Sequence, residues 1–513
     1  MKKHNTIKVV LITMLVFLLL SWILPAAYYS GQYVDQGRVQ MGLFDLFNYP
    51  LTSLSYFGYI GLFFILVGGF YGILYKIPAY RTFLERIVKL FEGKEKIILG
   101  IFVAIIALLV SVCGMQFGIA IFIPFIVALI LLMGYDKITA ALVTIGGIIA
   151  GLVGTTYAAN NTGILTGALA LDADFEIGIR WIILLVSVAL VIFNVLMYIG
   201  FKKKVKVEKK AVKVEKKEEI KPVKKSSSKK VTSAKKTTTK KTTKSSKKGK
   251  SVNKAALMEE DVIIVPAKVS GKHKIWPLVL TFSLLFVLFV LAFMPWTTFK
   301  VDAFEKASLA VQEFTLFKFP IFAKILGTFN PFGSWSITDL FLPMGLVILV
   351  LALIYKIKLD DLIDGFIDGA KKALAPAVIV ILLYTILVLV TYHPFQLVIY
   401  KAILGLTKGF NVATTVIVAL LAPIFNSDIA YSFQAVIPYY SSIVTKTANY
   451  PLAAVVFQSM YGVAMLFAPT SLVLMGVLAY LKVSYKDWLK AIWKLLLELF
   501  VALLIIFIIL ALI

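Results

Sequence analysis

Seven stretches of this chain are apolar over the length that a helix needs to cross a bilayer, and they limit its fold more than any other feature. A span of ~20 residues covers the hydrocarbon core, because a helix rises about 1.5 Å per residue. The runs are 7–27, 57–75, 179–200, 276–297, 337–355, 373–393 and 489–513. With 60% hydrophobic and 16% charged residues, the 513-residue chain has more apolar surface than a soluble core buries. We predict an all-α polytopic membrane protein.

Residues of the catalytic and metal-binding kinds are sparse. Cys113 is the single cysteine, which excludes an intrachain disulfide, and the three histidines lie far apart. Neither a metal-ligand spacing, a nucleophile with its base, nor a phosphate-binding loop is recognisable. We therefore expect a protein that is not an enzyme and that uses no cofactor beyond a coupling sodium ion or proton.

Basic residues predict which side of the membrane each loop faces, because Lys and Arg that flank a span stay in the cytoplasm. The basic segments are the N-terminus, 76–96, 201–274, 356–372 and 482–490. The loops 28–56 and 171–178 carry few basic residues. We expect a multi-pass protein of the cell (cytoplasmic) membrane, with the N-terminus and the Lys-rich linker in the cytoplasm.

This orientation makes the apolar segment 97–135 a hairpin. Lys96 and Lys137 flank it and are both expected inside, and the segment is interrupted at Gly114–Gly118. Irregular backbone at membrane depth is tolerated only where protein or a water-filled cavity satisfies its polar groups. The segment is thus predicted to enter from the cytoplasm, turn within the protein and return.

An offset of 315 residues superimposes the two most irregular apolar segments. It places Tyr135 on Tyr450, Gly147 on Gly462, and Thr155 and Thr156 on Thr470 and Ser471. Loop charges orient the two copies oppositely, which predicts an inverted repeat of the kind that forms substrate sites at interrupted helices. The alternative is a pair of unrelated kinked helices that happen to align.

The predicted organisation has four parts. A first repeat, 1–200, holds the inner hairpin 97–135 and a broken helix 139–170. A Lys-rich disordered linker, 201–274, precedes a linking helix and external loop, 275–336. A second, inverted repeat, 337–513, holds an outer hairpin 412–447 and a broken helix 449–480.

The linker carries most of the chain's formal charge of +26, because residues 202–250 contain 22 Lys and four Glu. Such a composition predicts disorder. A solvated spacer or contact with anionic lipid is favoured over a nucleic-acid tether, since no folded nucleic-acid module accompanies the Lys run.

The first candidate site joins the inner hairpin tip to the break of the first broken helix. Glycines let the backbone leave the helix, Thr and Asn supply oxygens and amides, and the restarted helix points its N-terminal amides at the same place. The candidate residues are Gly114, Gln116, Gly154, Thr155, Thr156, Asn160, Asn161 and Thr162. The alternative is close helix packing, for which small and hydroxylated residues are also common.

The second candidate site repeats this pattern at the outer hairpin and the second break. Its residues are Asn426, Ser427, Asp428, Pro469, Thr470 and Ser471. Asp428 either marks an ion, proton or cationic-ligand site at membrane depth or caps the following helix. A sodium ion would find oxygen ligands at Thr155, Asn160, Ser427 and Thr470. Neither segment carries an Arg or Lys, so we expect hydroxyls, amides and helix ends to hold an anionic substrate.

Several motifs resemble those of a known family. They are SWILPAAYYSG at 21–31, GLFDLF at 42–47, FFILVGGFYGILYK at 63–76, MGYDKITA at 133–140, DGFIDGAKKALAPAVIV at 364–380 and APTSLVLMGVLAYLKVSYKDWLK at 468–490. The chain resembles the YfcC-like branch of the anaerobic four-carbon dicarboxylate carriers, in the ion transporter superfamily. The resemblance covers nearly everything except the linker and the loop around 298–336.

The resemblance implies a homodimeric, elevator-type transporter of small carboxylated metabolites, coupled to a cation or working by exchange. Some relatives in the superfamily are believed to exchange basic amino acids. The chain departs from the family pattern at Gln116–Gly118, at Ala158 and Ala159, and at Asn426–Asp428, all within the predicted sites. The family's usual substrate is therefore not carried over to it.

We accordingly predict a secondary active transporter, a symporter or antiporter, of a small organic acid or amino acid. A basic amino acid antiporter of the arginine/ornithine type is the nearest alternative. A channel would need a continuous polar path, and a membrane scaffold built on the linker would lose its function without residues 202–250. The expected partners are the substrate, the bilayer and a second copy of the chain, without nucleic acid.

Overall fold

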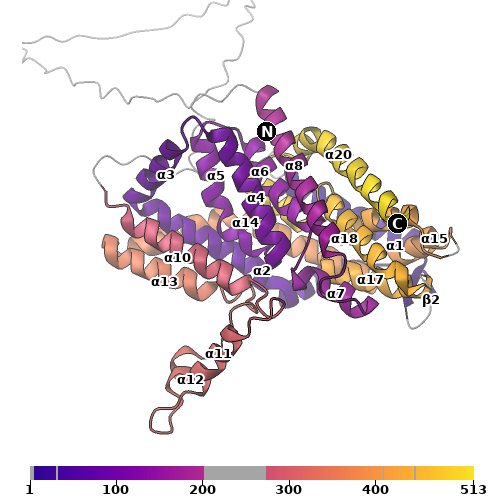
Figure 1. Ribbon diagram of the computed structural model, residues 1–513, viewed down its shortest axis with the longest axis horizontal. Helices are drawn as coiled ribbons and strands as arrows, with labels where there is room; N and C mark the ends of the chain where they lie inside the picture. Colours follow the sequence, from indigo (N-terminus) through magenta and orange to yellow (C-terminus); the bar gives the residue numbers. More distant parts are fainter. Residues whose placement is uncertain are drawn as a thin grey trace, which may run out of the picture.

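The computed structural model describes residues 5–29, 33–201, 273–327, 329–407, 409–443 and 446–512. They form a helical body with one two-stranded sheet, and an arm made of two short helices projects away from the body (Figure 1). The linker predicted at 201–274 lies outside the described residues, apart from Phe201, His273 and Lys274.

The first half of the chain contains the sheet and nine α-helices or 3-10 helices among the described residues. The elements are α1 (Asn5–Ile23), β1 (Ala26–Tyr29), β2 (Tyr33–Gly37), α2 (Asp45–Lys76), α3 (Pro78–Leu90), α4 (Glu95–Cys113), η1 (Gly118–Ile121), α5 (Ile123–Leu132), α6 (Lys137–Val153), α7 (Ala159–Leu169) and α8 (Ile177–Phe201). The strands β1 and β2 pair antiparallel, Tyr28 opposite Val34.

The second half is helical throughout its described part. The elements are α10 (Trp276–Phe293), α11 (Ala303–Glu313), α12 (Ile321–Leu326), α13 (Phe341–Tyr355), α14 (Leu359–Tyr392), α15 (Gln396–Leu404), α16 (Val412–Phe425), α17 (Ile429–Ile443), η2 (Thr447–Asn449), α18 (Tyr450–Ala464), α19 (Leu472–Leu481) and α20 (Tyr485–Leu512). The arm is formed by α11 and α12, within the segment predicted as an external loop (Figure 1).

Seven of the described helices are long and apolar enough to cross a membrane, which confirms the predicted all-α polytopic class. They are α1, α2, α4, α8, α10, α14 and α20. The apolar run 337–355 differs from its prediction, because its helix begins only at Phe341 and has 15 residues. Asp339 accepts hydrogen bonds from the backbone N–H and the hydroxyl of Ser336, and this turn delays the start of α13.

The long helices α2 and α14 cross in close backbone contact. A β-carbon at position 72 would lie 2.1 Å from the carbonyl oxygen of Gly365, and one at position 68 would lie 2.7 Å from that of Gly369. Contacts ascend along α2 as they descend along α14, so the two helices run antiparallel. Glycines at such spacing let membrane helices approach more closely than any side chain would allow.

The helices α4 and α6 run parallel, and α5, which lies between them in the sequence, runs in the opposite direction. Gly147 packs on Ile106, and Gly151 packs on the carbonyl of Ala107, so contacts ascend along both helices together. The segment that joins the end of α4 to the start of α6 must therefore run back, which makes α4 and α5 the arms of a hairpin. In the second half, α16 packs on α18 in the corresponding place.

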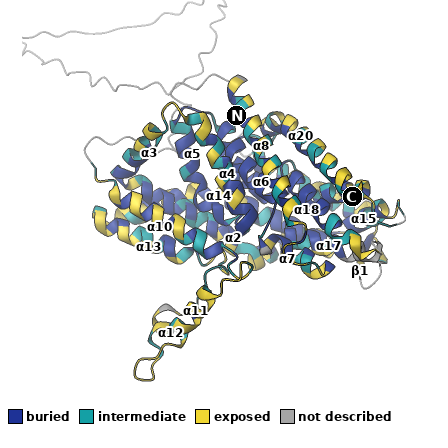
Figure 2. Cartoon of the chain, viewed as in Figure 1, coloured by how far each residue is buried: buried dark blue, intermediate teal, exposed yellow. Residues whose placement is uncertain are grey.

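The helices α6 and α18 lie in the interior of the body (Figure 2). Every residue of Thr139–Val153 is buried, as is every residue of Ala453–Ala464. A helix that is apolar on all sides can face either lipid or other protein, and the complete burial of these two shows that other protein surrounds them. The two interrupted helices thus form the core, and α2 with α14 borders it.

Candidate functional site

The two interrupted helices meet at the points where they end. A β-carbon at position 462, near the end of α18, would lie 2.7 Å from the backbone nitrogen of Val153, the last residue of α6. Gln458 of α18 reaches across, and its Nε2 donates a 3.1 Å hydrogen bond to the carbonyl oxygen of Thr155. The second half of the chain therefore contributes a side chain to the first break.

The first break is held open by Ser111 of α4. Its hydroxyl donates to the carbonyl oxygen of Gly154 at 2.6 Å, and its own carbonyl accepts from the backbone N–H of Thr156 at 3.0 Å. These bonds satisfy backbone groups that leave the helical pattern, which is needed in an apolar interior. Gly154 has no room for a side chain, since a β-carbon there would lie 2.3 Å from Cα of Leu184.

The second break uses the same device. The hydroxyl of Ser427 donates to the carbonyl oxygen of Thr470 at 2.6 Å, and in both breaks the two bonded residues are 43 positions apart. The Thr470 hydroxyl donates to the carbonyl of Pro423, and the Ser471 hydroxyl accepts from the N–H of Leu474, which caps α19. Each hairpin tip thus braces the break beside it.

Arg180 of α8 is a residue that the sequence pattern did not reveal. It is 2% exposed, and its Nε donates a 2.9 Å hydrogen bond to the carbonyl oxygen of Thr155. Its Nη1 donates to the carbonyls of Ala173 and Phe175 at 3.1 and 3.0 Å, and its guanidinium lies 4.3 Å from the centre of the Phe175 ring. The expectation that neither break contains a basic side chain is therefore wrong.

The turn that follows α7 explains why Arg180 lies at the break. The helix α7 ends at Leu169, the next residue Ala170 has a left-handed backbone with φ 50°, and the chain turns back so that α8 begins beside the break. Loop charges alone place the start of this helix at the membrane surface. One signal is available in the sequence, because the chain has four Arg among its 53 basic residues. An arginine kept in such a composition suggests a site that needs the guanidinium fork.

The other predicted residues of the first break divide into three groups. The hydroxyls of Thr155 and Thr162 bond to carbonyls of their own helices, and Thr156 bonds to Ser111. Asn161 is buried, and neither polar atom of its side chain has a partner among the described residues. Asn160 is exposed.

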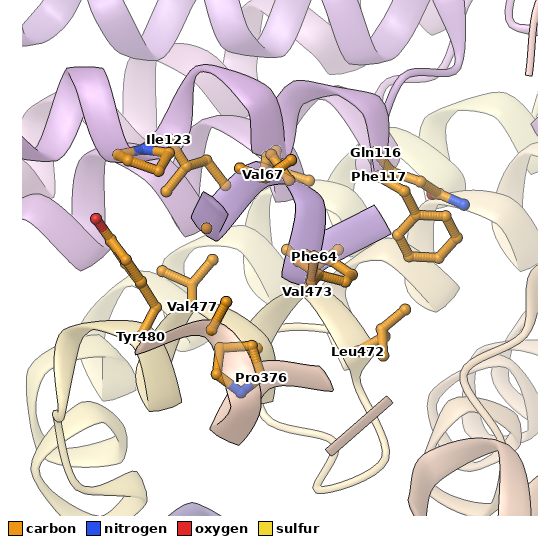
Figure 3. A pocket seen from close by; sticks show the side chains of 16 residues that line it. Phe64, Val67, Gln116, Phe117, Ile123, Pro376, Leu472, Val473, Val477 and Tyr480 are labelled. Atoms are coloured by element: carbon orange, nitrogen blue, oxygen red, sulfur yellow. The ribbon is translucent and has the colours of Figure 1, made fainter. Parts of the chain in front are cut away.

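The inner hairpin tip contributes backbone shape and not ligands. Gly114 has φ 68°, a left-handed conformation, and a β-carbon there would lie 3.4 Å from Cβ of Asn160. Gln116 instead faces an apolar cavity between α2, α14, the hairpin tip, α6 and α19 (Figure 3). Gln116 and Tyr480 are the polar side chains of its lining, so the cavity does not suit a carboxylate.

Asp428 caps α17 and forms no ion pair with a described residue. Its Oδ1 accepts a 2.9 Å hydrogen bond from the N–H of Tyr431, and the carboxylate has no basic side chain as a partner in the described part of the chain. Asn426 accepts from the N–H of Asp428 at 2.8 Å, and its own Nδ2 is buried without a described partner. Both sequence interpretations of Asp428, a helix cap and an ion site, are compatible with this geometry.

The pattern of the DcuC family, described as C4-dicarboxylate anaerobic carriers, matches residues 31–512. The chain belongs to the DcuC family. Membership confirms the predicted resemblance to dicarboxylate carriers. It also confirms that the protein is a transporter of small carboxylates and not an enzyme. Searches among curated proteins and among solved structures found no significant match. In this DcuC-family member, Arg180 and the meeting of the two breaks therefore have to be interpreted from their own geometry.

Proposed function

We propose that this protein is a secondary active transporter that binds a four-carbon dicarboxylate between the two breaks, by cation symport or by exchange. The observation that carries the proposal is the hydrogen bond from Gln458 to the Thr155 carbonyl, which connects α18 of the second half to the break that follows α6. Interrupted helices that face each other present backbone groups and helix ends to a shared ligand. The family description supplies the substrate class.

A basic amino acid antiporter of the arginine/ornithine type is the competing function, and Asp428 is the residue that favours it. Arg180 argues against it at the first break. Its guanidinium is buried directly on the Thr155 carbonyl, and a cationic substrate placed there would be repelled at short range. We therefore assign Asp428 to a coupling cation and not to a cationic substrate.

The presence of Arg180 at the first break also separates the four predicted sodium ligands into two pairs. The carbonyl of Thr155 already accepts bonds from Arg180 and Gln458, which disfavours a cation beside Thr155 and Asn160. Ser427 and Thr470 lie next to Asp428, with no described basic side chain bonded to them. A sodium ion or proton is therefore proposed at the second break.

The proposed movement is an elevator-type alternation. The glycine contacts between α2 and α14 favour these helices as the fixed part, and the hairpins with their braced breaks would move together as the other part. The proposal keeps the cell membrane as the location, with the N-terminus and the Lys-rich linker in the cytoplasm. It also keeps the homodimer and the contact of the linker with anionic lipid.

Counterflow in proteoliposomes tests the function. Vesicles loaded in turn with four-carbon dicarboxylates, monocarboxylates, arginine and ornithine are assayed with and without a sodium gradient. We expect accumulation of dicarboxylate only, reduced by Thr156→Ala and Ser471→Ala and unchanged by Thr338→Ala, whose side chain lies outside the breaks. Exchange of arginine or ornithine, or sustained single-channel currents in a planar bilayer, would contradict the proposal.

A further inference from the structure

The guanidinium of Arg180 is buried with one of its three nitrogens unused. Nε and Nη1 donate to three backbone carbonyls, whereas Nη2 is buried without a hydrogen-bond partner. Arg180 forms no ion pair with a described residue. Asp174, in the loop before α8, attracts the guanidinium at longer range, so the first break holds a positive charge without a carboxylate at ion-pair distance among the described residues.

Such an arrangement is costly. Carbonyl dipoles and the face of the Phe175 ring reduce the penalty of burying the cation, but they do not neutralise it. A buried charge without a partner normally destabilises a fold, and it is retained where a ligand provides the opposite charge. The free edge of a guanidinium is well suited to one anion, a carboxylate.

A second polar group is unpaired at the same place. Gln458 shares the Thr155 carbonyl with Arg180, and its Oε1 is buried without a partner. The amide comes from α18 and the guanidinium from α8, so the two halves of the chain converge on one carbonyl. Asn161, on the helix that restarts after this break, also has both polar side-chain atoms buried and unpaired.

We propose that Arg180 is the substrate's carboxylate anchor. Its Nη2 binds one carboxylate of the transported dicarboxylate, with Gln458 beside it, and this assignment rests on the proposed function. Because Nη2 is buried in this conformation, the carboxylate reaches it only when the surroundings of the break rearrange during transport.

The competing role is structural. Arg180 connects the loop carbonyls of Ala173 and Phe175 to the break, and it could serve only to hold the loop there. If Arg180 only holds the loop, its guanidinium stays buried, and the substrate does not alter how fast a reagent modifies it. A carboxylate anchor predicts that the guanidinium is reached during turnover and shielded by the substrate. The two roles therefore differ in a chemical readout at a native residue.

The chain contains few arginines, so the chemical modification of Arg180 can be measured without modification of other guanidinium groups. The four arginines are Arg38, Arg81, Arg86 and Arg180. The substitutions Arg38→Lys, Arg81→Lys and Arg86→Lys keep the charge at three positions outside both breaks and leave Arg180 as the single arginine. A fourth substitution, Arg180→Lys, gives the matched control without any arginine.

The experiment treats the single-arginine protein, in proteoliposomes, with phenylglyoxal, and follows adduct formation by intact mass and the loss of counterflow. We expect modification that inactivates transport and that a saturating four-carbon dicarboxylate slows at least about tenfold, as expected for tight shielding of one site. Its diamide should give no protection, and the arginine-free control should show no adduct. Equal modification with and without dicarboxylate, or no modification during turnover, would overturn the assignment.

Failure of this inference is distinguishable from failure of the proposed function. If the wild-type chain performs dicarboxylate counterflow but Arg180 is not protected, only the anchor is wrong. If the wild-type chain performs no dicarboxylate counterflow, the proposed function is wrong and the anchor with it.

Discussion

The two breaks share one scaffold and differ in charge. In each, a hairpin serine donates a 2.6 Å hydrogen bond to a break carbonyl 43 residues away. The first break adds the buried cation of Arg180, and the second adds the carboxylate of Asp428. The difference indicates that the repeat supplies the frame, and that residues without a counterpart in the other half give the two breaks opposite charges.

The 315-residue offset makes this contrast sharper. It places Arg180 on Leu495, Asp428 on Cys113 and Gln458 on Val143. All three polar residues therefore correspond to apolar residues in the other half. Polar groups are expensive at membrane depth, and a group that the frame does not need is retained for another purpose.

The largest effect on transport is expected from Asp428→Asn. Asparagine caps a helix about as well as aspartate, so the variant removes the charge and keeps the cap. We expect the sodium concentration for half-maximal dicarboxylate uptake to rise at least about tenfold, the equivalent of about 1.4 kcal/mol. Initial rates of uptake against sodium concentration measure it.

The control for this variant is Asp302→Asn, which removes an exposed carboxylate in the arm that pairs with Lys306. A sodium dependence and a pH dependence of uptake that are both unchanged in Asp428→Asn would mean that Asp428 acts as a helix cap alone. A change of the same size in Asp302→Asn would point to surface charge instead.

Removing the two bracing hydroxyls is expected to lower the stability of the fold. Ser111→Ala and Ser427→Ala each leave a buried carbonyl without its donor, at a cost of about 1–3 kcal/mol. Ser111 also contacts the N–H and the hydroxyl of Thr156, so its loss should lower the thermal unfolding temperature further. Unfolding of the purified protein followed by intrinsic fluorescence ranks the variants.

Ser55→Ala is the matched control, because Ser55 is an exposed helical serine that bonds to its own helix. If Ser55→Ala lowered the unfolding temperature as much as the other two variants, the proposed bracing role of Ser111 and Ser427 would be wrong. A larger shift for Ser427→Ala than for Ser111→Ala would reverse the expected order of the breaks.

Much of the frame follows from sequence because its causes are local. Glycine at 154 and proline at 469 disfavour the helical backbone, and the helices α6 and α18 do end near them. The end of α18 still comes earlier, at Ala464, because Met465–Ala468 form turns with their own hydrogen bonds. The long helices α2 and α14 also begin about three and about four turns before their apolar runs, since polar first turns extend a helix without adding hydropathy.

The charged residues of the site are harder to predict, because tertiary geometry decides where they point. Arg180 stands near the end of a run and beside an acidic loop, which is typical of a residue at the membrane surface. Only the turn at Ala170 brings it to Thr155. Gln458 lies within a continuous apolar helix, and its contact with Thr155 spans 303 positions of sequence that no local pattern relates.

The most direct test of opposite polarity compares a four-carbon dicarboxylate with its mono-amide in counterflow at saturating sodium. Arg180→Gln and Asp428→Asn are measured side by side with the wild-type chain. The account predicts that the ratio of kcat/KM for the two substrates falls toward one in Arg180→Gln and stays at the wild-type value in Asp428→Asn. An unchanged ratio in Arg180→Gln, or an equal fall in both variants, would contradict it.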